Sequence, residues 1–240
     1  MRIFLLLLMS LSLWANIGNV MAIKGSVDIE RAESTLHAIN GMALEEGDTI
    51  LTSVKSRVQV MLKDSTIITI GASSSFSFIE YFYDESKKSK LTMHANRGFF
   101  RSVTGQIGKL APERFKVKTV SATIGIRGTD FSGEIFEDRE VFKCYEGAIF
   151  IEFEGNIQDL DAGMMAEILK GKYEIKKFDA SKTQKGDTKP KGIVIKSIDS
   201  SEVPTEIISD ITQIIEDENN NAEDDSLSTD AAAEDRQHQY

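Results

Sequence analysis

Between residues 16 and 170 the chain consists almost entirely of short segments in which apolar and polar residues alternate. These segments are rich in β-branched and aromatic side chains, and glycine, aspartate, serine and asparagine separate them. Such alternation is typical of half-buried strands, and strands that recur every 8 to 12 residues or so indicate an all-β domain. The clearest segments are SRVQVML (56–62), STIITI (65–70), SFSFIEYF (75–82), RFKVKTV (114–120), FSGEIF (131–136), EVFKCY (140–145) and AIFIEF (148–153). We therefore predict an all-β fold, with residues 16–170 forming one domain of many short strands arranged as a solenoid or a sandwich.

The N-terminus has the layout of an export signal. Met1 and Arg2 precede a 12-residue apolar block, IFLLLLMSLSLW (residues 3–14), and small residues follow it. A membrane-spanning helix needs about 20 apolar residues, so a cleaved signal peptide over residues 1–15 is the favoured interpretation. We expect cleavage after Ala15, with cleavage after Ala22 or an uncleaved inner-membrane anchor as alternatives. The predicted location is periplasmic or secreted.

The C-terminal quarter differs in composition from the β domain. Residues 171–200 contain eight lysines and are predicted to be a linker or loop. The lysines lack interleaved aromatic residues, so we do not expect a nucleic-acid partner. Residues 201–240 hold 12 acidic residues and one basic residue, Arg236. Residues 216–240 have almost no large apolar side chains, which predicts a disordered acidic tail.

A short helix is predicted over residues 201–215. Its isoleucines recur at helical spacing and would form one apolar face. They are Ile207, Ile208, Ile211, Ile214 and Ile215. This face either packs on its own domain or is offered to a groove on a partner.

The sequence gives no pattern of residues typical of an enzyme or a metal site. The single cysteine, Cys144, cannot form an intramolecular disulfide, and its place in VFKCYEG predicts a buried thiol. His37, His94 and His238 have no neighbours at metal-ligand spacing. We also find no nucleophile elbow and no phosphate-binding glycine loop. The prediction is a non-enzymatic protein with no catalytic residues, metal or cofactor.

The stretch SATIGIRGTDF (121–131) is the candidate functional motif. Gly125 would allow a neighbouring segment to approach closely, and Gly128 would form a bulge or tight bend. We expect the guanidinium of Arg127 to staple the bend to turn carbonyls or to a carboxylate. The carboxylates considered are Asp130, Asp48 and Asp64. In the alternative interpretation, Arg127 and Thr129 face a groove and bind an anionic ligand or a partner.

The order of these segments resembles the FecR domain family over residues 16 to about 168. The resemblance rests on IGNVMAIKGSVDIER (17–31), MALEEGDTILTSVKSRVQVMLKDSTIITIGASSSFSF (42–78), RGFFRSVTGQ (97–106), the GIRGT of the candidate motif, CYEGAIFIEF (144–153) and LDAGMMAEI (160–168). It makes the turn at Gly47 and Asp48 and the turn at Asp64 part of the candidate site. In the family, glycine usually follows the aspartate of the second turn, whereas Ser65 stands here.

The resemblance also sets the functional expectations. The family's founding regulators carry an anti-sigma segment and a spanning helix ahead of the domain, whereas here the domain follows the signal directly, so we do not expect this chain alone to control a sigma factor. We favour an exported module that binds an unidentified envelope protein. One alternative is a membrane-anchored envelope sensor that takes part in signal transduction. The other is a structural or surface component that self-associates through β edges, as a homo-oligomer, with the aromatics Phe76, Phe78, Tyr81 and Tyr83 as an apolar patch.

Overall fold

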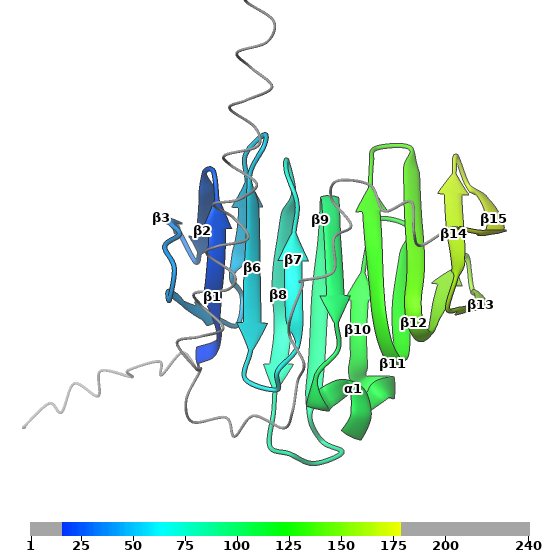
Figure 1. Cartoon of the computed structure of the whole chain (residues 1–240), viewed down its shortest axis with the longest axis horizontal. Coiled ribbons are helices and arrows are strands. Elements are labelled where there is room, and N and C mark those ends of the chain that lie inside the picture. Colours follow the sequence, from blue (N-terminus) through cyan, green and yellow to red (C-terminus); the bar gives the residue numbers. More distant parts are fainter. Residues whose placement is uncertain (1–15, 179–240) are drawn as a thin grey trace, which may run out of the picture.

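The computed structural model describes residues 16–178, and these form one continuous β-sheet folded into two layers (Figure 1). The first half of the sequence contributes β1 (Asn16–Lys24), β2 (Val27–Arg31), β3 (Ser34–His37), β4 (Ala43–Glu45), β5 (Thr49–Thr52), β6 (Arg57–Leu62), β7 (Ile67–Ile70), β8 (Ser75–Phe82) and β9 (Lys90–Val103). The second half contributes α1 (Gln106–Leu110), a 3-10 turn η1 (Pro112–Arg114), β10 (Phe115–Lys118), β11 (Ala122–Ile135), β12 (Arg139–Phe153), β13 (Asn156–Asp161), β14 (Met164–Leu169) and β15 (Lys172–Lys177). The predicted all-β fold is confirmed.

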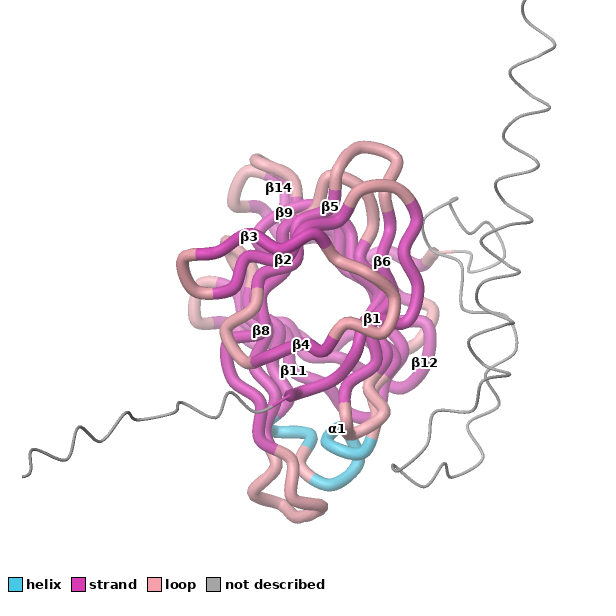
Figure 2. The backbone as a smooth tube through the Cα atoms, turned by 90° about the vertical axis from the view of Figure 1, so that its left-hand side faces the viewer, coloured by secondary structure: helices cyan, strands magenta, loops and turns pink. Residues whose placement is uncertain are grey.

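The long strands β9, β11 and β12 belong to both layers. The first half of β9 pairs with β8 and β10, and its second half pairs with β7 and β11. Likewise, β12 pairs with β14 near its start and with β13 near its end. The first layer therefore runs β4, β1, β6, β7, β9, β11, β12, β14, β15, and the second runs β3, β2, β5, β8, β9, β10, β11, β12, β13. Viewed down the long axis, the strands enclose the interior (Figure 2).

Each long strand changes layer beside a glycine with positive φ. Gly98 in β9 has φ +86°, Gly128 in β11 has φ +60° and Gly147 in β12 has φ +74°. Only glycine adopts such a conformation without a steric cost. In β11 the register with β12 shifts between Arg127 and Asp130, so a bulge stands at the predicted bend.

The core lies between the two layers. It contains the fully buried rings of Phe76, Phe78, Phe100 and Phe131, which contact one another edge-on or tilted. Edge-to-face contacts of this kind contribute beyond the area they bury. Phe76 and Phe78 are thus core residues, and they do not contribute to the surface patch that the self-association hypothesis considered. Tyr81 and Tyr83 are partly buried and pack against the same core.

Two sequence expectations need correction. The β body does not end at residue 170, because β15 occupies Lys172–Lys177 inside the predicted linker. Its sequence KYEIKK is almost entirely exposed, so it lacks the buried positions that would have marked a strand. In addition, FSGEIF is the second half of β11, while EVFKCY and AIFIEF are two halves of β12. The signal peptide, the rest of the linker, the predicted helix and the acidic tail lie outside the described residues.

The corner in β12 provides a stability test. A Cβ on Gly147 would collide with the backbone carbonyl of Gly128, whereas a Cβ on Gly155 would meet nothing within 4 Å. The two glycines have nearly equal φ angles of +74° and +76°. Gly155→Ala should therefore lower the free energy of unfolding by about 1 kcal/mol, the cost of positive φ alone. Gly147→Ala should lower it by more than about 2 kcal/mol, because the strand crossing must also shift.

Urea unfolding of both variants, followed by circular dichroism, measures the difference. Equal losses of stability would show that the two strands do not need their close approach at this corner.

Candidate functional site

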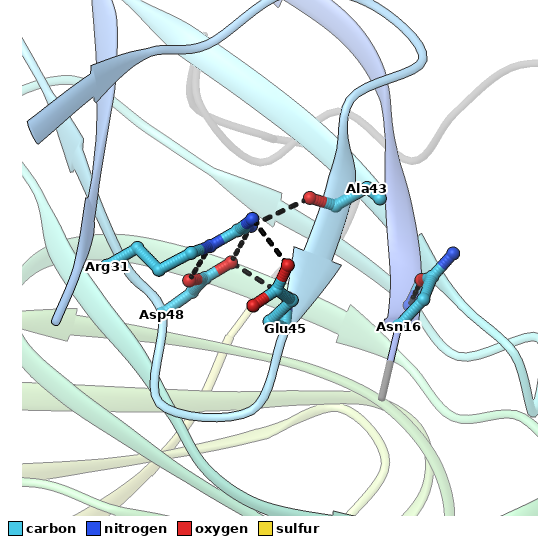
Figure 3. Close-up of polar contacts among 6 residues, drawn as sticks. Asn16, Arg31, Ala43, Glu45 and Asp48 are labelled. Carbon is cyan, nitrogen blue, oxygen red and sulfur yellow. Dashed lines mark hydrogen bonds and ion pairs between the residues drawn. The ribbon is translucent and has the colours of Figure 1, made fainter. Parts of the chain in front are cut away.

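The turn at Gly47 and Asp48 is built around an ion pair between the buried Asp48 and the partly buried Arg31 (Figure 3). Arg31 is the last residue of β2, and its Nε and Nη2 donate to the two carboxylate oxygens of Asp48 at 2.8 and 2.7 Å. Its Nη1 donates to Glu45 Oε1 at 2.7 Å, and its Nη2 also reaches the carbonyl oxygen of Ala43 at 2.8 Å. The guanidinium thus ties β2 to β4 and to the turn that follows β4. We call Arg31, Glu45 and Asp48 the Arg31 clamp.

Local backbone requirements explain the residues of this turn. Gly47 has φ +91°, and its N–H donates to the carbonyl oxygen of Phe78 at 2.7 Å. Asp48 is fully buried, and its Oδ2 also accepts a hydrogen bond from the backbone N–H of Glu45 at 2.8 Å. The carboxylate is therefore satisfied within the fold by a bidentate arginine and a backbone donor. Hydrogen bonding to Asp48 raises the pKa of the Arg31 guanidinium above its usual value.

The second turn places a buried carboxylate in a neutral environment. Asp64 is fully buried, and its Oδ2 accepts hydrogen bonds from Thr66 Oγ1 at 2.7 Å and from the N–H of Ile107 at 3.1 Å. The backbone N–H of Asp64 donates to the hydroxyl of Tyr81 at 2.9 Å. Asp64 therefore joins the β6–β7 turn to β8 and to the start of α1. Burial raises the pKa of the Asp64 carboxyl, because desolvation penalises its charged form.

Ser65 takes the conformation for which glycine is usual. Its φ is +65°, in the left-handed region. The turn geometry is therefore compatible with serine at this position, at a local steric cost.

The candidate motif lies where β11 crosses between the layers, but Arg127 does not act as the predicted staple. Arg127 pairs with Ala148 of β12 through its backbone, but its side chain is exposed and makes no hydrogen bond or ion pair with other residues in the range 16–178. Asp130 is instead held by Arg101 of β9, whose Nε and Nη2 donate to its two oxygens at 2.9 and 3.1 Å. Asp48 is held by Arg31 and Asp64 by neutral donors, so all three proposed carboxylates have other partners. The sequence hypothesis chose the wrong arginine.

The Arg101–Asp130 pair is almost completely shielded from solvent. The two side chains are 6% and 3% exposed. The guanidinium of Arg101 lies 4.1 Å from the ring centroid of Tyr145, which in turn makes an edge contact with Phe178. This aromatic cover reduces access of water to the pair and strengthens the cation–π contact. The pair therefore joins β9 to β11 next to the point where β11 changes layer.

The remaining residues of the motif have packing roles. Gly125 pairs with Phe150 of β12, and a Cβ on Gly125 would overlap the Phe150 ring. The close neighbour is thus an aromatic side chain folded over the glycine, an arrangement that protects a glycine within a sheet. Thr129 is buried, and its N–H donates to Thr104 Oγ1 at 3.0 Å. It does not accompany Arg127 at the surface.

Sequence reasoning missed the two arginines that hold buried aspartates. Arg31 closes the segment IKGSVDIER, whose terminal arginine was part of the FecR resemblance, so a signal for it was present. Arg101 lies in RGFFRSV, directly after Phe100, so alternation places the two side chains on different faces of the strand. Because Phe100 is the core residue, the pattern gives no sign that Arg101 is buried as well. The contact with Tyr145, which covers Arg101, is seen only in the folded structure.

The described residues offer no obvious chemistry beyond these contacts. No group of three or more histidine, cysteine, aspartate or glutamate side chains between residues 16 and 178 could hold a metal ion. Cys144 is buried, and burial raises the pKa of its thiol to about 11, which disfavours the reactive thiolate. No helix in the same part of the chain is long and apolar enough to cross a membrane.

Comparison with known proteins identifies the domain. The family described as FecR protein matches residues 48–150, from Asp48 of the Arg31 clamp into β12. The chain contains a FecR domain. This match covers GIRGTD and the Asp64 turn, whereas Arg31 lies ahead of it.

The FecR domain also has distant structural neighbours. Two crystal structures, at 1.65 and 2.50 Å resolution, are of a candidate anti-sigma factor from Parabacteroides distasonis ATCC 8503. They have 17% and 16% sequence identity to this chain and TM-scores of 0.46 and 0.47. Each comparison covers 56% of this chain, which spans 61% of the length of the matched chain. No curated protein matches the sequence.

The Arg31 clamp should contribute far more to stability than Arg127. Arg31→Ala leaves the buried carboxylate of Asp48 without its cation, so the free energy of unfolding should fall by about 3 kcal/mol. Arg127→Ala is the matched control and should change it by less than about 0.5 kcal/mol, because Arg127 is exposed. Chemical denaturation of both variants tests this. A loss from Arg127→Ala as large as that from Arg31→Ala would restore Arg127 as a structural staple.

Asp64 should give the protein an unusual pH dependence. Because burial raises the pKa of Asp64 in the folded state, the folded state binds more protons than the unfolded state above about pH 4. The stability that Asp64 contributes is therefore present at low pH and is lost as pH rises through its folded pKa. Relative to Asp64→Asn, the wild type should lose stability between about pH 4 and that pKa.

Asp84→Asn provides a control of opposite sign. Hydrogen bonds from Ser86 and then Ser89 lower the pKa of Asp84 in the folded state. Its stabilising contribution is thus present above its unfolded pKa and is lost as pH falls. Thermal unfolding from about pH 2 to about pH 8 measures both differences, because the Asp84 window lies below the usual aspartate pKa of about 4 and the Asp64 window lies above it. A flat difference curve for Asp64→Asn would contradict the assignment.

Proposed function

We propose that this FecR-domain protein is a non-enzymatic regulator of signalling in the bacterial cell envelope. The observation that carries the proposal is the FecR match over residues 48–150. This match supports the signalling alternative more directly than the free binding module that we favoured from the sequence. The predicted export signal over residues 1–15, which lies outside the described residues, supports a location in the envelope.

The regulator acts by contact with another envelope protein. The two buried aspartates, Asp48 and Asp130, are engaged within the fold, because each binds an arginine. Arg127, in contrast, presents a guanidinium at the exposed side of the strand crossing, next to the bend at Gly128. A planar cation held on a fixed corner suits recognition of a carboxylate on a partner. Arg127 is therefore the residue of the GIRGTD motif that we assign to partner binding.

The test is transcriptional complementation in the native host. Deletion of the gene should change the transcription of a defined set of genes, and the full wild-type chain should reverse the change. Arg127→Glu should reverse it at least about fivefold less well, since a carboxylate replaces the cation that meets the partner. Lys87→Glu, which makes the same charge change in the exposed β8–β9 loop, should complement like the wild type.

For each strain, mass spectrometry of the soluble and membrane fractions measures the amount of the protein and identifies its N-terminal residue. Unchanged transcription on deletion would refute the regulatory function. Equal complementation by Arg127→Glu at equal protein amount would refute the role of Arg127 alone.

A further inference from the structure

The two ends of the folded sheet differ in how their edges are protected. At one end, the edge strands β4 and β3 have only three and four residues, and the Arg31 clamp engages the carbonyl oxygen of Ala43 in β4. At the other end, the edge strands β13 and β15 have six residues each. Short edges resist pairing with another chain, whereas longer ones invite it.

β15 extends beyond the second layer. Past β12, the first layer continues through β14 to β15, whereas the second layer stops at β13 (Figure 1). Within residues 16–178, β15 pairs only with β14. Its central residue, Ile175, is 37% exposed. The strand therefore offers both an unpaired backbone edge and an apolar side chain.

Strand geometry determines which backbone groups of β15 face outward. The N–H of Phe178 donates to the carbonyl oxygen of Gly163, across the β14–β15 ladder. In an antiparallel pair, hydrogen-bonded and non-bonded positions alternate. Glu174 and Lys176 therefore bond toward β14, while Tyr173, Ile175 and Lys177 direct their backbone N–H and C=O groups away from the sheet.

From this arrangement we propose that β15 pairs with β15 of a second copy of the chain, antiparallel and centred on Ile175. In this register Ile175 lies opposite its counterpart, and Glu174 lies opposite Lys176 of the second copy. Within one copy Lys176 already contacts Glu174 at 2.9 Å and Glu167 at 3.4 Å, so the charges on this exposed face would form a network that spans both copies. Both the outward backbone groups and the opposite charges are then matched.

Charge also selects this register over its neighbours. A slip that keeps the same backbone alternation places either Glu174 or Lys176 opposite the identical residue, and like charges in direct opposition are destabilising. Self-pairing of β13 is less favourable, because Asp159 and Asp161 both lie exposed on that edge. A six-residue edge buries much less than the roughly 1,600 Å² of a standard interface. The dimer should therefore be weak and dependent on concentration.

The proposal is independent of the regulatory function and is tested by charge exchange. Sedimentation equilibrium of the full chain over a range of concentrations should show a monomer–dimer equilibrium. Glu174→Lys or Lys176→Glu alone should weaken dimerisation by roughly tenfold or more, because each variant opposes like charges twice. An equimolar mixture of the two variants should dimerise again, since every cross-strand pair is then of opposite sign.

A backbone variant separates edge pairing from folding. Ile175→Pro removes an outward N–H that β14 does not use, so it should abolish the dimer and leave the circular dichroism spectrum unchanged. Lys176→Pro removes an inward N–H and should lower stability as well. The proposal is overturned if the wild type remains monomeric at all concentrations, or if the dimer survives both single charge variants. Failure of the mixed variants to associate would also overturn it.

Discussion

The need for three long strands to serve two layers is the constraint on which the fold depends. A strand cannot leave one layer and continue in the other without a sharp local change of direction, and β9, β11 and β12 each make that change beside a glycine with positive φ. Gly147 lies so close to the backbone of Gly128 that β12 could not carry a side chain at this contact, whereas Gly128 needs to be glycine for its positive φ alone. The aromatic core between the layers is continuous because the same strands line both of its sides.

The buried charges stabilise the places that regular strand pairing leaves weak. Arg31 holds the N-terminal end of the sheet, where the edge strand β4 has only three residues, and Arg101 holds Asp130 beside the bulge in β11. Asp64 joins the β6–β7 turn to α1 without any cation. Because these residues are engaged within the fold, their roles are architectural. The exposed Arg127 on the same crossing is thereby separated from the residues that fold it.

The alternation of apolar residues was sufficient to predict the all-β class and most strands, because burial on one face leaves a period of two in the sequence. It was not sufficient to predict that two apparent strands form one long strand, since a glycine corner interrupts the pattern without ending the hydrogen-bond ladder. The same limit affected the site. Asp48 and Asp64 entered the candidate site through the resemblance to the FecR family, but the partner of Asp48 is 17 residues away, and no local pattern encodes that contact.

The open end of the sheet can be understood from the same principles. An internal strand shows a clear alternation of apolar and polar residues, because one of its faces is buried and both of its edges are paired. In contrast, β15 has one paired edge and almost no buried face. The residues of β15 are therefore not constrained by packing in the core, and they can instead determine how its free edge pairs. In KYEIKK a glutamate and a lysine flank Ile175, so Glu174 and Lys176 exchange places when the strand is reversed about that residue. One such pair is enough to favour a single antiparallel register, because each neighbouring register brings two identical charges face to face.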